Sequence, residues 1–166
     1  MKFVMKKVIF VVMLLLPLLC SAGGGTGGPG KEMFSLAEQY RGKEGFEIVK
    51  FSRTGMFFLK KMMRASLDKE EAKQLSVLND IERMLILEYG SAAPALRKKF
   101  SDSALKILGR YEALAEIKSD GETVRIYGEI DDGGGRIGNP VIFTGDAVIC
   151  LFGKLNIEDL GQMTGN

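Results

Sequence analysis

The spacing of apolar residues along the chain predicts both helices and strands. Apolar side chains recur every three or four residues in some segments and alternate with polar ones in others. Residues 81–89 fit both periods, and their short length and the glycine that follows favour a strand. The pattern therefore predicts helices over 33–40, 55–67, 94–108 and 156–163, and strands over 46–52, 81–89, 124–130, 140–144 and 147–152.

These elements predict one α+β domain over residues 33–166. The strands cluster in the last third of the chain, where short turns separate them, as in an antiparallel meander. We expect a mostly antiparallel sheet of about five strands with helices packed on one face, ending in a three-strand meander. Residues 147–152 are apolar on both faces, which indicates a central strand covered on each side.

The segment 55–67 is unusually rich in Met and Phe. Thr54 is the expected N-cap, and two adjoining faces of the predicted helix are apolar. Such a helix either fills an irregular core or presents an adaptable binding surface. Core filling is the more common case, and an interaction surface needs its side chains to be exposed. The residues that would form that surface are Met56, Phe57 and Met63.

The first 22 residues have the three parts of a secretory signal peptide. Lys2, Lys6 and Lys7 precede an apolar run of 12 residues, Val8–Leu19, and small residues follow it up to Ala22. The run is shorter than the roughly 20 residues of an ordinary membrane span, although an uncleaved N-terminal anchor is the alternative. The chain is therefore expected to be exported, to the periplasm or the outer membrane.

Cys20 leaves open how the exported chain is processed. Cleavage after Ala22 is the first interpretation. A cysteine directly after the apolar run is also typical of bacterial lipoproteins, although the preceding residue, Leu19, is larger than is usual there. Lipidation of Cys20 would tether the chain to a membrane, whereas cleavage would release it. Residues 23–32 are rich in glycine and are expected to form a flexible tether.

Removal of the signal peptide changes the net charge. The whole chain has 23 basic and 21 acidic residues, and three of the basic ones lie in the first 22 residues, so 20 remain against 21. The mature domain is then nearly neutral and lacks the basic excess of most nucleic-acid-binding proteins. We therefore do not expect nucleic acid as a partner.

The composition excludes several kinds of catalysis. The chain has no histidine, which removes the usual general base and the commonest metal ligand. Cys150 lies in an apolar segment and is expected to be a buried core residue. Neither a cofactor nor a metal is predicted. Carboxylate chemistry remains as an alternative, and its candidates are Glu70–Glu71, Asp80 with Glu82, and Asp131–Asp132, although turns and solvated helix faces also explain them.

The order of these segments over residues 33–163 resembles a known family. It resembles the small exported bacterial proteins labelled domain of unknown function 4252. This resemblance implies a Gram-negative envelope protein, secreted or lipid-anchored, with no assigned activity, cofactor or catalytic residue. The segments that carry it are Phe46–Ser52, Met62–Met63, Ile81–Leu87, Leu96–Phe100, Tyr111–Leu114, Asp120–Tyr127 and Leu151–Leu160.

Two functional hypotheses follow from the sequence. The first is a non-catalytic envelope module that binds another envelope protein or an apolar ligand through the helix at 55–67. The second is an envelope hydrolase that uses carboxylates, which needs two acidic groups facing each other in a cleft. A purely structural component is a third outcome that the sequence does not separate from the first.

Overall fold

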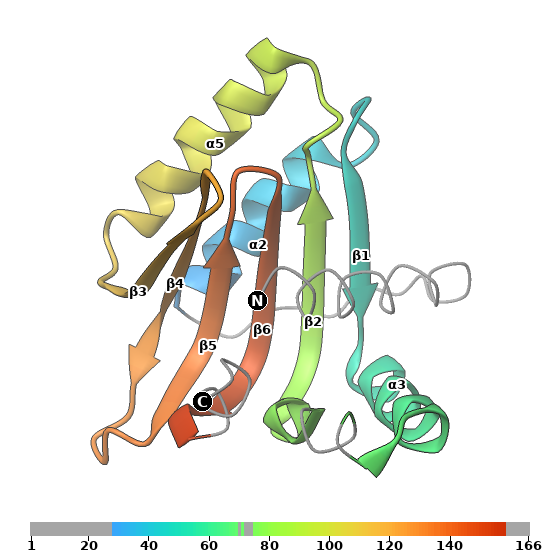
Figure 1. Cartoon of the computed structure of the whole chain (residues 1–166). Helices are drawn as coiled ribbons and strands as arrows, with labels where there is room; N and C mark the ends of the chain where they lie inside the picture. The colour runs from blue at the N-terminus through green and yellow to red at the C-terminus, as the bar shows by residue number, and fades with distance from the viewer. Residues whose placement is uncertain (1–27, 70, 72–74, 159–166) are drawn as a thin grey trace.

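The computed structural model of the chain describes residues 28–69, 71 and 75–158. The predicted α+β class is confirmed, with helices packed on an antiparallel sheet (Figure 1). The helices are α2 (Pro29–Tyr40), α3 (Arg53–Ser66) and α5 (Pro94–Leu108), with a short 3-10 helix, η1 (Leu75–Leu78). The strands are β1 (Glu47–Phe51), β2 (Ile81–Glu88), β3 (Ala113–Ser119), β4 (Glu122–Ile130), β5 (Arg136–Phe143) and β6 (Ala147–Asn156).

The sheet contains six strands in the order β1-β2-β6-β5-β4-β3. Four consecutive strands, β3 to β6, form an antiparallel meander, and β2 pairs with its last strand. The predicted meander had three strands, and the additional one is β3. This strand lies at the edge of the sheet and contains Ala113 and Ala115, and alanine is a weak strand former. Its short apolar pattern is therefore a poor sequence signal.

Strand β2 confirms the prediction for residues 81–89 and supplies side chains to both faces of the sheet. Leu85 and Leu87 belong to one hydrophobic cluster, while Met84 and Ile86 belong to another. All four are at most 5% exposed. Because successive side chains of a strand point to opposite faces, the two clusters lie on the two sides of the sheet.

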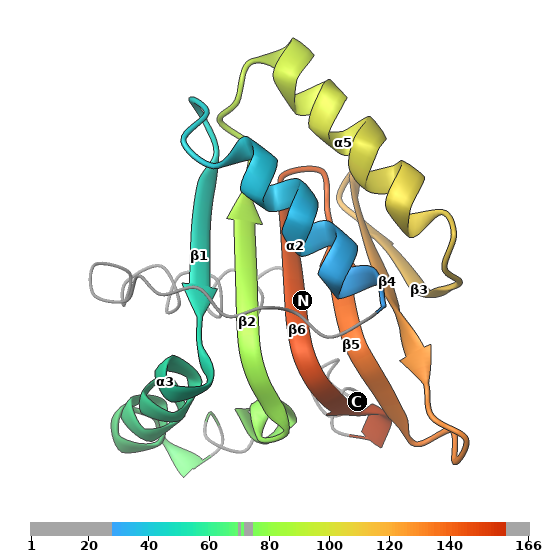
Figure 2. The same ribbon diagram turned by 180° about the vertical axis from the view of Figure 1, so that it is seen from behind.

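Helices α2 and α5 cover one face of the sheet (Figure 2). Below them, four aromatic rings pack with centroid separations between 4.7 and 6.3 Å. Two of these rings carry a hydroxyl, and one of the two hydroxyls donates a hydrogen bond of 2.6 Å to the carbonyl of Thr144; burial raises its pKa to about 12. The four residues are Tyr40, Phe46, Tyr89 and Phe100, of which Tyr89 makes that hydrogen bond.

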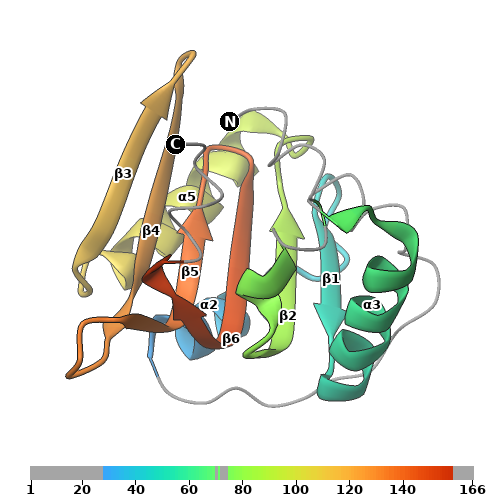
Figure 3. The ribbon, with the colours of Figure 1, turned by 60° about the horizontal axis from the view of Figure 1, so that its bottom comes forward.

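Helix α3 lies on the opposite face, which corrects the expectation that all helices share one face. It contacts β1 and β2, and Figure 3 shows it beside this edge, away from α2 and α5. Met56, Leu59 and Met63 of α3 pack with Met84 and Ile86 of β2 in the second cluster. The chain can place a helix here because β2 is apolar on both faces.

Helix α2 begins at Pro29, inside the segment 23–32 that was predicted as a tether. Proline suits the first turn of a helix because the missing N–H has no partner there in any case. Gly30 lets this turn approach the sheet, since a Cβ added to it would lie 3.1 Å from the ring of Phe152. Residues 29–32 therefore belong to the folded domain. The predicted signal peptide, residues 23–27 and the end of the predicted helix at 156–163 lie outside the described residues.

The loop between α2 and β1 provides a matched pair of glycines. Gly42 and Gly45 have nearly equal φ values, +77° and +78°, but a Cβ would meet nothing within 4 Å at Gly42 and would lie 2.3 Å from the Cα of Ala92 at Gly45. We expect Gly42→Ala to lower the free energy of unfolding by about 1–2 kcal/mol through backbone strain alone. Gly45→Ala should cost roughly 1–3 kcal/mol more through overlap. Urea unfolding measures both, and equal losses would contradict the predicted close approach.

Candidate functional site

Helix α3 exposes a group of large apolar side chains to solvent. Phe57 is 63% exposed, Phe58 52% and Met62 51%. The two rings pack edge to face with centroids 5.8 Å apart, and Met62 follows Phe58 by one helical turn. These three residues are called the α3 surface. Among the described residues, the other large apolar side chains that are exposed are Ile130 and Ile157.

The structure divides the predicted interaction residues between the surface and the core. Phe57 is exposed, whereas Met56 and Met63 are only 1% and 5% exposed and pack against β2. The two methionines therefore belong to the core, and the exposed apolar neighbours of Phe57 are Phe58 and Met62. The sequence pattern showed two adjoining apolar faces on this helix and favoured core filling, but Met56 and Met63 were named with Phe57 as the residues of a possible interaction surface.

Polar contacts hold α3 firmly on the start of β2. The ammonium group of Lys60 donates hydrogen bonds to the carbonyls of Asn79, at 2.8 Å, and Ile81, at 2.7 Å. Arg64 donates to the side-chain oxygen of Asn79 at 2.7 Å, and Arg53 pairs with Glu82 at 2.5 Å. The burial that these contacts require lowers the pKa of Lys60. The α3 surface is thus presented by a fixed helix.

The N-terminus of α3 is capped two residues earlier than the sequence indicated. The helix begins at Arg53, and the hydroxyl of Ser52 accepts a hydrogen bond of 3.1 Å from the backbone N–H of Gly55. Ser52, and not Thr54, is therefore the N-cap. Either residue type is a good cap, so the choice depended on where β1 ends.

The polar side of α3 is basic. The helix contains Arg53, Lys60, Lys61 and Arg64 and no acidic residue. Three of these side chains are engaged in the contacts with β2 described above. Lys61 is exposed, and within the described part of the chain its side chain makes no ion pair or hydrogen bond. The α3 surface therefore has one unpaired positive charge at its border.

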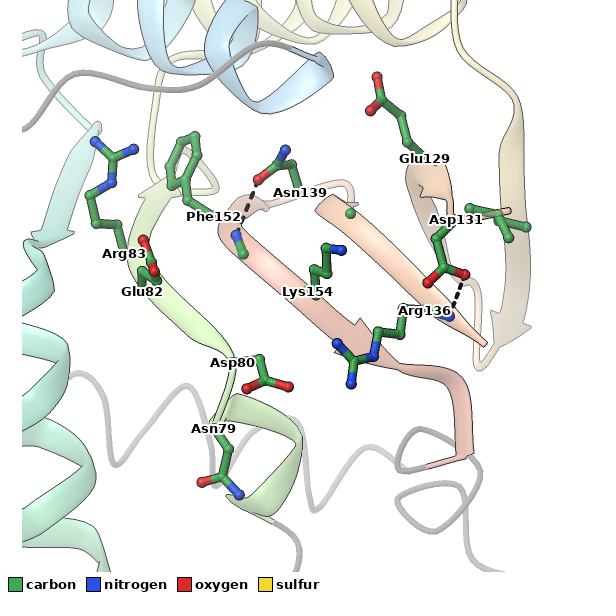
Figure 4. A pocket seen from close by; sticks show the side chains of 13 residues that line it. Asn79, Asp80, Glu82, Arg83, Glu129, Asp131, Arg136, Asn139, Phe152 and Lys154 are labelled. Carbon is green, nitrogen blue, oxygen red and sulfur yellow. Dashed lines mark hydrogen bonds between the residues drawn. The ribbon is translucent and has the colours of Figure 1, made fainter. Parts of the chain in front are cut away.

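The structure brings several of the candidate carboxylates to one hollow. Asp80, Glu82 and Asp131 line an open hollow of about 750 Å³ (Figure 4). It lies at the end of the sheet where β2 and β5 begin and β4 and β6 end, called the lower end of the sheet. Glu82 is paired with Arg53, and Asp131 accepts hydrogen bonds from the backbone N–H groups of Gly135 and Arg136 at 3.1 and 3.2 Å. Both carboxylates therefore have structural roles: Glu82 holds α3 through Arg53, and Asp131 holds its own turn.

The other candidate acids do not enter this hollow. Asp132 is exposed in the turn between β4 and β5. The carboxylate of Glu71 accepts a hydrogen bond of 3.4 Å from the N–H of Asp68, and Asp68 accepts one of 2.8 Å from the N–H of Glu71. Glu70 lies outside the described residues. Among the residues that the structure describes, no three Asp, Glu or Cys side chains are arranged to hold a metal ion.

Cys150 is buried in the core between the two layers. It is 0% exposed, and burial raises the pKa of its thiol to about 12. Its cross-strand neighbours Leu85 and Val141 are equally buried. A thiol in this position is protonated and inaccessible, which fits the core role expected of it. Cys20, the candidate lipidation residue, lies outside the described residues.

Comparison with known proteins identifies one family. A family model described as domain of unknown function (DUF4252) matches residues 40–163. No curated protein and no solved structure matches the chain. In the described part of the chain, no helix has both the length and the apolar character needed to cross a bilayer.

The division of α3 into a buried and an exposed face can be measured by alanine substitution. Met56→Ala removes a fully buried side chain and should lower the free energy of unfolding by about 2–5 kcal/mol. Phe57→Ala removes a mostly exposed one and should change it by no more than about 0.5 kcal/mol. Chemical denaturation of the two variants tests this, and a comparable loss for Phe57→Ala would show that the ring is packed.

The burial of Cys150 predicts that the thiol reacts only after unfolding. Because reaction requires the thiolate, a pKa of about 12 suppresses it at pH 8, and the closed core blocks access as well. Labelling with a thiol reagent at pH 8 should therefore follow the unfolding rate and become rapid in urea. Fast stoichiometric labelling of the native protein would contradict this placement.

Proposed function

The chain belongs to the domain of unknown function 4252 (DUF4252) family, and we propose that it is a non-catalytic interaction module that binds a protein partner through the α3 surface. The observation that carries this proposal is the exposure of Phe57, Phe58 and Met62 side by side on one helix. Contiguous apolar side chains at the surface of a folded domain are typical of interaction sites.

The energetics of the α3 surface favour binding. Burying a Phe or Met side chain completely is worth about 1.5–3 kcal/mol, so the exposed half of each contributes about 1 kcal/mol when it is covered. Helix α3 is already fixed by its contacts with Asn79, Ile81 and Glu82. A fixed helix loses little conformational freedom when it binds, which preserves more of this gain.

The shape of the α3 surface favours a protein groove over a small apolar ligand. Small ligands are usually enclosed in concave pockets, whereas Phe57, Phe58 and Met62 protrude from the outer side of a helix. Protruding side chains at helical spacing suit insertion into a hydrophobic groove of another protein. The exposed Lys61 beside them would be matched by an acidic residue at the rim of that groove.

We place this module in the bacterial envelope. The support is the pattern of the first 22 residues, with Lys2, Lys6 and Lys7, the apolar run Val8–Leu19 and small residues up to Ala22. Cleavage after Ala22 would release the domain into the periplasm, and lipidation of Cys20 would hold it at a membrane. In either case the partner is an envelope protein.

The alternative of a carboxylate-based hydrolase has weaker support. The hollow does bring Asp80, Glu82 and Asp131 together. However, Glu82 is paired with Arg53 and Asp131 caps its own turn, so neither is free to exchange a proton with a substrate. Three cationic side chains, Arg83, Arg136 and Lys154, also line the hollow.

Site-specific crosslinking in intact cells tests the proposed interaction. A photoreactive phenylalanine analogue placed at Phe57 should give one discrete adduct, because this ring lies in the contact. Adding Phe58→Ser and Met62→Ser should reduce that adduct at least about tenfold, since each removes apolar area from the same surface.

A control uses the exposed Ile130 on β4, which is 53% exposed and lies outside α3. The same analogue at Ile130 should give no such adduct, and Ile130→Ser should leave the adduct from Phe57 unchanged. Identical adducts from both positions, or an adduct that survives Phe58→Ser with Met62→Ser, would overturn the proposal. All variants should retain the thermal midpoint of the parent within about 2 °C, since the altered side chains are exposed.

A further inference from the structure

The hollow at the lower end of the sheet lies on the face that carries α2. Phe152, which lines it, belongs to the core beneath α2 and α5, and Lys154 lies two residues further along the same strand. The register pairs Lys154 with Gly138, and Gly138 with Glu129. Because Gly138 has no side chain, a gap remains between Lys154 on β6 and Glu129 on β4, and this gap forms the floor of the hollow.

Irregular strand pairing shapes the hollow. The register shifts between Ile81 and Arg83, between Tyr127 and Glu129, and between Gly138 and Val141. Gly153 has a φ of +141°, and its N–H donates a hydrogen bond of 3.1 Å to the side-chain oxygen of Asn139. Bulges bend strands and re-aim side chains, and they are frequent beside functional sites. Here they fall on four neighbouring strands at one level of the sheet.

Three cations form a diagonal row across this part of the sheet. Arg83 pairs in register with Phe152, Lys154 follows Phe152 by two residues, and Arg136 precedes Gly138 by two. Diagonal neighbours of this kind have Cα atoms about 7–8 Å apart, so like charges repel. Figure 4 shows the three side chains around the hollow.

None of the three cations is neutralised by a carboxylate within the described residues. Arg83 lies over the ring of Phe152, with its guanidinium carbon 5.4 Å from the ring centroid, and this contact leaves its donors unused. Lys154 and Arg136 make no side-chain hydrogen bond or ion pair with another described residue. Their donors are therefore available to a ligand.

Two of the four acids that line the hollow are engaged elsewhere. Glu82 pairs with Arg53, and Asp131 accepts from the backbone of its turn. The side chains of Asp80 and Glu129 make no hydrogen bond or ion pair with another described residue; Glu129 lies in register with Lys154 across Gly138, and its carboxylate is directed toward Gly28 at the start of α2. The hollow thus has three cationic side chains and, at its border, two carboxylate acceptors.

From this arrangement we propose that the hollow binds a small oxyanion ligand, a carboxylate or a phosphate, through Lys154, Arg136 and Arg83. The guanidinium group of arginine can donate two parallel hydrogen bonds to two oxygens of either group, and lysine supplies a mobile donor. An anion relieves the repulsion among the three cations. Glu129 accepts a hydrogen bond from a hydroxyl or ammonium group at the other end of the ligand. The site is independent of the α3 surface and of its protein partner.

Titration of the exported chain with two probes tests the proposal. Inorganic phosphate and citrate represent the two sources of oxyanion, and sodium chloride at matched ionic strength corrects for screening. The NMR chemical shifts of the backbone amides of Gly138 and Gly153 report on binding, because both residues line the hollow. We expect saturable shifts with at least one probe, and the probe with the lower dissociation constant identifies the ligand class.

Charge-removing variants complete the test. Lys154→Gln with Arg136→Gln should weaken binding by at least about tenfold, since each removes a charged hydrogen-bond donor. Lys99→Gln, an exposed lysine on α5, is the matched control and should leave the affinity unchanged. The absence of saturable shifts beyond those of chloride, or equal affinities for the double variant and the control, would overturn the proposal.

Discussion

The double-sided burial of β2 is the constraint on which the rest of the structure depends. Leu85 and Leu87 face α2 and α5, while Met84 and Ile86 face α3. A strand with apolar side chains on both faces is stable only when both faces are covered, so the fold needs a layer on each side of the sheet. The position of α3, and with it the position of the exposed apolar side chains, follows from this requirement. If α2 and α5 were the only cover, the face of β2 that carries Met84 and Ile86 would be exposed to water.

The sequence predicted most of the fold because local signals and tertiary packing agree over most of the chain. The helix at 94–108 has proline at its start and glycine after its end, and the structure gives these same bounds. Residues 81–89 were ambiguous by period, and the strand hypothesis is confirmed. The sequence did not reveal the edge strand β3. This strand pairs on one side only, so its side chains need not alternate strongly between apolar and polar. The start of α2 was missed because Gly30 resembles a linker residue, although it is needed for close packing on Phe152.

The helix of the proposed interaction surface was predicted from the sequence, but the residues named for that surface were only partly the exposed ones. Helix α3 has an apolar stripe wide enough to cover two faces, and periodicity does not say which of them meets the sheet. The contact with Met84 and Ile86 selects Met56, Leu59 and Met63 for the core, leaving Phe57 and its neighbours outside. The hollow could not be predicted at all, because it depends on three register shifts and on the pairing of Gly138 with Lys154. Register is a tertiary property, and a slip of one residue would send these side chains to the other face.

The α3 surface and the hollow lie on different faces of the sheet, yet one short segment both contacts the polar side of α3 and lines the hollow. Asn79 accepts hydrogen bonds from Lys60 and Arg64 of α3 and also lines the hollow. Glu82 pairs with Arg53 of α3 and lines the hollow as well. Residues 79–82 therefore contact α3 on one side and line the hollow on the other, and such a spatial link does not by itself couple two sites. Coupling would require an element with two arrangements that both sites bias, so the shared segment fixes the position of α3 beside the hollow and leaves the two proposed sites independent.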